Sequence, residues 1–137
     1  MTTEPRLATA GDVPLRIHAA RGTDRGSGAV LFFHGLRSSS DVLDADARVI
    51  ASAGVTVILV DAPHHGARRD AVLEHMPDTG TRAGYATLLR ILREARDEVP
   101  ALVDHAHALG FEKVAVGGVS LGGFIALAAA VSEPRLA

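Results

Sequence analysis

Short apolar runs alternate along the chain with longer segments in which apolar residues recur every three or four positions. The runs Ala29–Phe33, Val55–Val60 and Lys113–Gly118 are almost continuously apolar, which is typical of strands buried on both faces. The segment Val13–Ala20 instead alternates apolar and polar residues, which predicts a half-buried strand or a strand at a sheet edge. The pattern therefore predicts a sheet whose strands are separated by helices.

Helical spacing marks the segments after these strands. The predicted helices are residues 41–53, 84–109 and 121–131. Ser40 or Asp41 suits the N-cap of the first helix, and we expect Pro100 to kink or restart the second. In the first helix Val42, Leu43, Val49 and Ile50 are expected to share an apolar face. In the second, one face is expected to hold Tyr85, Leu88, Leu89 and Leu92, and a second apolar set follows at Val99, Leu102, Val103, Ala106 and Leu109.

The order of these elements predicts the fold class. Strands and helices alternate, which indicates an α/β protein with a mostly parallel sheet flanked by helices. The chain of 137 residues has the length of one domain. We expect residues 1–12 to be a polar, loose lead-in and residues 13–137 to form the domain. Within it, residues 21–28 are predicted to be a glycine-rich loop and residues 64–83 an irregular excursion.

Composition narrows the classes of function. A net charge of −2 without a basic run argues against a nucleic-acid binder. The chain has no cysteine, which excludes disulfides, thiolate nucleophiles and cysteine-ligated metals, and no histidine pair has metal-ligand spacing. No nucleotide-binding motif is present, so we expect neither a cofactor nor a metal. The first thirty residues lack a secretory signal, which predicts a cytoplasmic protein.

One uncharged segment has almost the length of a membrane span. Val114–Val131 contains 18 residues without a charge. Glycines at positions 117, 118, 122 and 123 crowd its middle, and each costs about 1 kcal/mol inside a helix. We therefore expect a strand and a helix joined by a sharp turn, and no contact with a membrane.

That turn carries the candidate nucleophile. Gly118-Val119-Ser120-Leu121-Gly122 matches the pattern G-x-S-x-G and lies between the predicted strand and helix, the context of a nucleophile elbow. Such a turn holds the serine in a strained backbone conformation, and the glycines allow the strand and helix to approach each other. We expect Ser120 to be the nucleophile. The alternative is an ordinary tight turn whose serine only caps the helix.

A second motif follows the first apolar run. His34-Gly35-Leu36 stands where a loop can direct a backbone N–H toward the elbow. Stabilising an oxyanion takes two such donors, and we expect them to be the N–H groups of Leu36 and Leu121. Gly35 allows the loop to fold back, and we expect His34 to hold the loop by hydrogen bonds and not to act in catalysis.

Together these motifs resemble the α/β-hydrolase superfamily. The stretches FFHGL, VILVDAPHHGARR and AVGGVSLGG are most similar to bacterial esterases related to dienelactone hydrolases and prolyl oligopeptidases. The resemblance covers residues 13–131 and implies an acyl-transfer site with Ser120 as nucleophile, Leu36 and Leu121 as oxyanion donors, and Gly118 and Gly122 flanking the serine. It also implies that His65 and Arg68 shape a loop beside the pocket, that residues 66–83 form part of a substrate cap, and that the strand 29–33 lies beside the elbow strand.

The resemblance is incomplete after the elbow. In this superfamily an acid and then a histidine follow the serine, but the chain after Ser120 has only Glu133 and no histidine. On the order of 90 residues of strand–helix units would be absent. We therefore expect the fold to be incomplete after the elbow, by truncation, gene splitting or partial ordering, and the triad partners to lie beyond residue 137. His34, His64 and His65 are the alternative internal bases, whereas His105 and His107 are expected at the surface.

These observations support two functions of different class. The first is a serine hydrolase that cleaves esters or thioesters of small molecules through an acyl-enzyme on Ser120, with peptidase and acyltransferase chemistry left open. The second is a non-catalytic module of the same fold that binds a ligand or partner. In either case we expect an open sheet edge beside the elbow strand, where the chain associates with itself or with a complementing chain.

Overall fold

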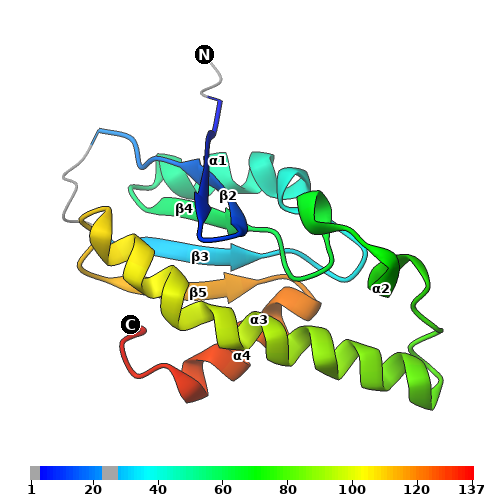
Figure 1. Ribbon diagram of the computed structural model, residues 1–137. Helices are drawn as coiled ribbons and strands as arrows, with labels where there is room; N and C mark the ends of the chain where they lie inside the picture. The colour runs from blue at the N-terminus through cyan, green and yellow to red at the C-terminus, as the bar shows by residue number, and fades with distance from the viewer. Residues whose placement is uncertain (1–3, 23–27) are drawn as a thin grey trace.

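The computed structural model describes residues 4–22 and 28–137 and consists of a five-stranded sheet between two layers of helices (Figure 1). Residues 1–3 of the predicted lead-in and residues 23–27 of the predicted loop lie outside the described residues. The elements, in chain order, are β1 (Arg6–Ala10), β2 (Val13–His18), β3 (Ala29–Phe33), η1 (Ser40–Leu43), α1 (Asp44–Ser52), β4 (Thr56–Val60), η2 (Gly66–Arg68), α2 (Ala71–Glu74), α3 (Arg82–Ala108), β5 (Val114–Gly118) and α4 (Leu121–Ser132).

The strand order is β1-β2-β4-β3-β5, and the sheet is mixed. Strands β4, β3 and β5 run parallel, as the three apolar runs predict, while β1–β2 and β2–β4 pair antiparallel. The prediction of an α/β fold with a sheet flanked by helices is confirmed. Strand β3 lies beside β5, so the loops that follow these two strands meet at one edge of the sheet.

Helices cover both faces of the sheet, which explains the continuous apolar run in β4. Val57 and Leu59 of β4 face α1 and pack in a cluster with Leu43 and Ala47. The neighbours of Val57 and Leu59 along the strand, Ile58 and Val60, belong to the main core on the other side, where α3 and α4 lie. All five residues of β4 are therefore buried.

The N-terminal prediction is corrected by the structure. Arg6–Ala10 is not a loose lead-in but strand β1, which pairs with β2 across a two-residue turn at Gly11 and Asp12. Gly11 has φ +58, a value that glycine adopts without strain. The sequence gives little sign of β1 because most of its side chains are exposed, so no apolar run marks it. Strand β2 is consequently an inner strand and not the sheet edge.

Two predictions about helices are corrected in part. Val42 and Val49 are exposed; the buried residues of this segment include Leu43, Ala47 and Ala51. Helix α3 runs unbroken through Pro100, which is exposed. The carbonyl that loses its partner at a solvent-facing proline can bond to water, so the helix tolerates Pro100 without restarting.

The excursion over residues 64–83 contains only the short helices η2 and α2, in agreement with the irregular pattern. Among the described residues, no helix is both long enough and apolar enough to cross a bilayer.

Candidate active site

Ser120 occupies the turn between β5 and α4 with φ +55 and ψ −115. A positive φ is rare for a residue with a side chain and is held in place by the surroundings. Here the Ser120 carbonyl accepts hydrogen bonds from Gly123 and Phe124, and the preceding Val119 N–H donates to the carbonyl of Phe33 at 3.0 Å. The serine side chain is exposed at the start of a helix of 12 residues.

The two glycines of the motif are required by close packing. A Cβ on Gly118 would overlap the backbone of Gly122, and a Cβ on Gly122 would overlap the carbonyl of Phe33 at the end of β3. The glycines therefore let α4 start directly against β3 and β5. This contact brings the elbow beside the loop that follows β3.

The loop His34–Arg37 touches the elbow. A Cβ on Gly35 would lie 3.6 Å from both Ser120 Cβ and Val119 O, so Gly35 lies in van der Waals range of the serine. Leu36, Ser120 and Leu121 line one cavity. Within residues 4–22 and 28–137, no acceptor is bonded to the backbone N–H of Leu36 or of Leu121. Two unengaged N–H donors thus belong to residues at the serine.

Two buried histidines hold this loop. His34 Nε2 accepts the N–H of Ala62 at 3.1 Å, and its Nδ1 lies 2.8 Å from the carbonyl of Gly35. His65 Nε2 accepts the N–H of Arg37 at 3.0 Å, and its Nδ1 lies 2.8 Å from the carbonyl of Pro63. Each ring therefore accepts at Nε2 and donates at Nδ1, which is the pattern of a neutral imidazole.

Burial agrees with this neutral state. Both rings are fully buried, and their centroids lie 5.1 Å apart. Burial lowers the pKa of His34 and, together with the neighbouring histidines, lowers the pKa of His65. Since all four ring nitrogens are engaged by backbone groups, neither histidine has a lone pair free to take a proton from Ser120.

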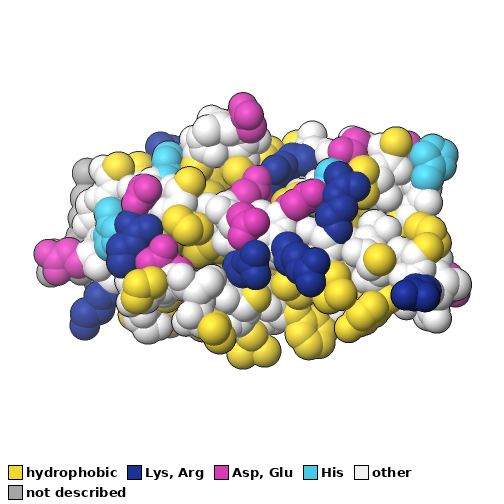
Figure 2. Space-filling view, turned by 60° about the horizontal axis from the view of Figure 1, so that its bottom comes forward, with side chains coloured by type: hydrophobic (Ala, Val, Ile, Leu, Met, Phe, Trp, Pro, Cys, Tyr) yellow, Lys and Arg dark blue, Asp and Glu magenta, His cyan; other side chains and the backbone are white. Residues whose placement is uncertain are grey.

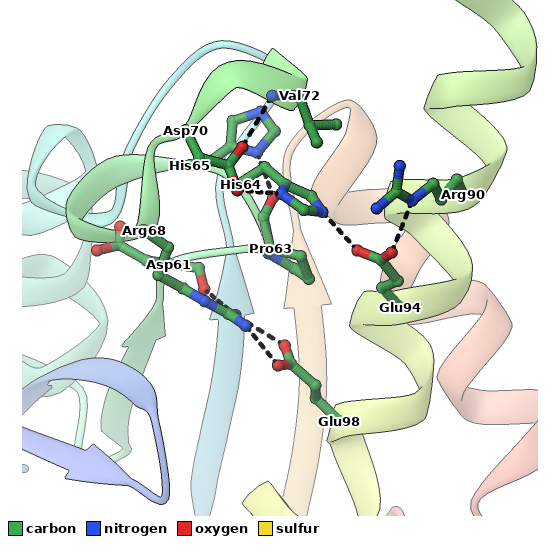
Figure 3. Close-up of polar contacts among 10 residues, drawn as sticks. All are labelled: Asp61, Pro63, His64, His65, Arg68, Asp70, Val72, Arg90, Glu94 and Glu98. Carbon is green, nitrogen blue, oxygen red and sulfur yellow. Dashed lines mark hydrogen bonds and ion pairs between the residues drawn. The ribbon is translucent and has the colours of Figure 1, made fainter. Parts of the chain in front are cut away.

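Arg68 belongs to a polar cluster that joins the excursion to α3 (Figure 3). Its guanidinium makes two hydrogen bonds to Glu98, at 2.8 and 2.6 Å, and one to the carbonyl of Asp61. The hydrogen bonds with Glu98 raise the pKa of Arg68. Arg68 therefore fixes the loop after β4 against α3.

His64 is the centre of the same cluster. Its Nδ1 lies 2.7 Å from Asp70, and its Nε2 lies 2.6 Å from Glu94 of α3 (Figure 3). Both partners are carboxylates, so both ring nitrogens of His64 are engaged. Burial would raise the pKa of Glu94, but hydrogen bonds from Arg90 and His64 outweigh it and lower that pKa overall. No histidine of this loop is left as a base for Ser120.

Sequence reasoning missed the walls of the serine cavity. Besides the residues already named, Thr79 of the excursion, Phe124 of α4 and an apolar stripe of α3 line it. The stripe consists of Tyr85, Leu88, Leu89 and Leu92. The spacing of these residues did predict a shared helix face, but spacing alone does not tell a face toward the core from a face toward a cavity.

Among the described residues, no group of acidic and histidine side chains could hold a metal ion.

Comparison with known proteins identifies the family of the chain. A family model described as "Alpha/beta hydrolase family" matches residues 30–137. The chain is 33% identical over 109 residues to a protein named Esterase YjfP of Escherichia coli (strain K12), covering 78% of this chain and 41% of that protein. The chain therefore spans about two fifths of this relative.

Solved structures share the fold at lower sequence identity. Est1E from Butyrivibrio proteoclasticus, determined with ferulic acid bound, is similar with a TM-score of 0.67 and 19% identity, over 96% of this chain and 49% of that one. TT1662 from Thermus thermophilus has a TM-score of 0.66 and 22% identity, over 92% of this chain and 50% of that one.

Proposed function

Because the chain belongs to the alpha/beta hydrolase family, we propose that it carries the nucleophile and the oxyanion donors of a serine esterase. The observation that carries the proposal is the position of Ser120. Its side chain lies on a strained turn beside two residues, Leu36 and Leu121, whose N–H groups have no acceptor within the described part of the chain. The similarity to a protein named as an esterase supports the reaction class.

The reaction forms and breaks bonds at one carbonyl carbon. Ser120 Oγ attacks the carbonyl, a base takes the hydroxyl proton, and the N–H groups of Leu36 and Leu121 donate to the oxygen that becomes negative. The bond to the alcohol oxygen then breaks as that oxygen receives the proton, which leaves an acyl group on Ser120. Water attacks this ester in the same way, releases the acid and restores the serine.

The base and its orienting acid are proposed to lie outside this chain's 137 residues. The buried histidines beside the serine loop are neutral with both nitrogens engaged, and His64 is held between two carboxylates. The chain also spans only 41% of its E. coli relative. We propose that the polypeptide following residue 137 supplies the acid and then the histidine.

The test compares Ser120→Ala with Ser132→Ala in a polypeptide that includes the following region. Ser132 lies on α4, where its hydroxyl bonds to the carbonyl of Ala128. A fluorophosphonate should label the parent and Ser132→Ala but not Ser120→Ala. Hydrolysis of p-nitrophenyl acetate should fall at least about 10³-fold in Ser120→Ala only, because the triad acts through its nucleophile.

Full turnover in Ser120→Ala would disprove the assignment of the nucleophile. A parent that neither reacts with the fluorophosphonate nor hydrolyses any ester would favour the non-catalytic module instead. Truncation of the parent after residue 137 should cost at least about 10³-fold in kcat/KM, since the remaining donors alone give little catalysis.

A further inference from the structure

The cavity beside Ser120 has walls from four separate segments. Leu36 comes from the loop after β3, Leu121 and Phe124 come from α4, and Thr79 comes from the excursion. The remaining wall is the apolar stripe of α3, formed by Tyr85, Leu88, Leu89 and Leu92. These four residues stand at positions i, i+3, i+4 and i+7, so they lie on one side of the helix.

The chemistry of these walls is almost uniform. The cavity has a volume of about 250 Å³, and none of its lining residues carries a charge. Its only polar side chains are Ser120, Thr79 and Tyr85. Apolar surface gains free energy when it is removed from water, so such a cavity favours an apolar group beside the reacting carbonyl.

The charged groups of this region lie elsewhere. His64, Arg68, Glu94 and Glu98 line a separate cleft between the excursion and α3. The guanidinium of Arg37 is directed to the carbonyls of Leu73 and Met76. A carboxylate placed in the serine cavity would therefore lose its water without gaining a cationic partner, which is strongly unfavourable.

Resting on the proposed function, we propose that this cavity selects esters by binding an uncharged, apolar acyl or alcohol group. At the ~30 Å³ that one water molecule occupies in the liquid, the cavity holds roughly eight groups of methylene size. The preferred substrates are thus esters of medium-length aliphatic or small aromatic groups. The apolar stripe of α3 limits the length of the acyl or alcohol group that the cavity can bind.

Leu89 is the best position for a test, because it is partly buried and lies outside the main core cluster, whereas Leu88 and Leu92 pack against that cluster. Leu89→Trp narrows the cavity and Leu89→Ala widens it. Val49→Trp is the control, since Val49 is exposed on α1, across the sheet from α3 and α4. The variants are made in the polypeptide that includes the region after residue 137.

Two series of substrates distinguish the two sides of the ester. In the first, p-nitrophenyl esters carry acyl groups from acetate to dodecanoate; in the second, acetate esters carry alcohols from methyl to octyl. For the side that occupies the cavity, Leu89→Trp should lower the ratio of kcat/KM between the eight-carbon and the shortest member at least tenfold. Leu89→Ala should shift the preference toward longer groups, and Val49→Trp should match the parent.

A third substrate tests the charge. A hexanoate ester should react at least tenfold faster than the ester of adipic acid with a free carboxylate at the far end, since only the latter brings a charge into the cavity. Unchanged length profiles in both Leu89 variants, or equal rates for the two substrates, would overturn the inference while Ser120→Ala still abolished turnover. If the parent hydrolyses no ester, the proposed function is wrong and this inference falls with it.

Discussion

The backbone of Ser120 has a conformation that costs about 1–3 kcal/mol for a residue with a side chain. Packing holds the turn in this conformation, because it lies between the end of β3 and the start of α4. There the backbones approach too closely for any residue larger than glycine at positions 118 and 122. The exposed hydroxyl is therefore a consequence of contacts that its neighbours make.

Gly122 and Gly123 provide a matched pair for this argument. Gly122→Ala should destabilise the chain by about 1–3 kcal/mol or more, because its Cβ would overlap a carbonyl oxygen that cannot move without disturbing β3. Gly123→Ala should be neutral or stabilise by up to about 1 kcal/mol, because its Cβ meets only Gly118 O at 3.6 Å and alanine favours the helix. Denaturant unfolding measures both.

Equal effects of the two substitutions would mean that the close approach of α4 to β3 does not hold the turn in its conformation.

At the residue scale the motif was predictive, since the glycine spacing on either side of Ser120 is visible in five consecutive residues. The atom that Gly122 avoids was not predictable, because the carbonyl of Phe33 belongs to a strand 89 positions earlier in the chain.

At the scale of elements, the paired histidines connect the ends of two parallel strands. His34 follows β3 and bonds to the backbone after β4, and His65 follows β4 and bonds to the loop after β3. Leu36 lies between the two anchored points. The hydrogen bonds of His34 and His65 thus orient the Leu36 N–H that the proposed mechanism needs.

The burial of His34 and His65 predicts that the stability of the chain depends on pH. The pKa values of His34 and His65 are lowered in the folded chain, while an unfolded histidine titrates near 6.5. Below about pH 6.5 the unfolded chain binds protons that the folded chain does not bind, so the free energy of unfolding should fall as the pH decreases from 7 to 5. Each histidine contributes at most about 1.4 kcal/mol per pH unit.

Urea unfolding at pH 7, 6 and 5 measures this slope. In His34→Gln the slope should be smaller, because glutamine can still accept a hydrogen bond but does not titrate between pH 7 and 5. An identical slope in parent and variant would contradict the assignment of a neutral, buried His34.

The cluster around His64 works at the same scale, between the excursion and α3. His64 and Arg68 each reach a carboxylate on α3, thirty positions further along the chain. These bonds set the position of the excursion relative to the helix that lines the serine cavity. Sequence reasoning assigned His65 and Arg68 to this loop by resemblance, but the partners Glu94 and Glu98 follow only from the docking of α3.

For the whole molecule, the exposed apolar side is the side of the edge strand β5 and of α4. Strand β5 pairs only with β3 within the described residues, and the N–H of Ala137 bonds to the carbonyl of Val114. On α4, Phe124, Leu127 and Val131 are 61%, 67% and 91% exposed. Figure 2, with this side turned forward, shows hydrophobic side chains gathered along its lower edge. An open edge beside exposed apolar residues favours association.

We expect the 137-residue chain to associate in a concentration-dependent way, as measured by sedimentation or light scattering. The double variant Leu127→Lys with Val131→Lys should weaken this association, because it places charges on the apolar side of α4. Val42→Lys with Val49→Lys is the control, since these valines are similarly exposed near α1. A parent that stays monomeric, or equal effects of the two pairs, would contradict the prediction.

The sequence by itself determined the features that depend on nearby residues. Apolar runs predicted β3, β4 and β5, helical spacing predicted α3, an alanine-rich segment predicted α4, and the glycine–serine motif predicted the turn at Ser120, because each pattern lies within one element or one turn. The tertiary structure decided what depends on pairing between distant segments. Strand β1 has few buried side chains and exists through its hydrogen bonds to β2. The apolar stripe of α3 lines a cavity because of where the helix docks, and the buried histidines find their partners because β3 and β4 are neighbours.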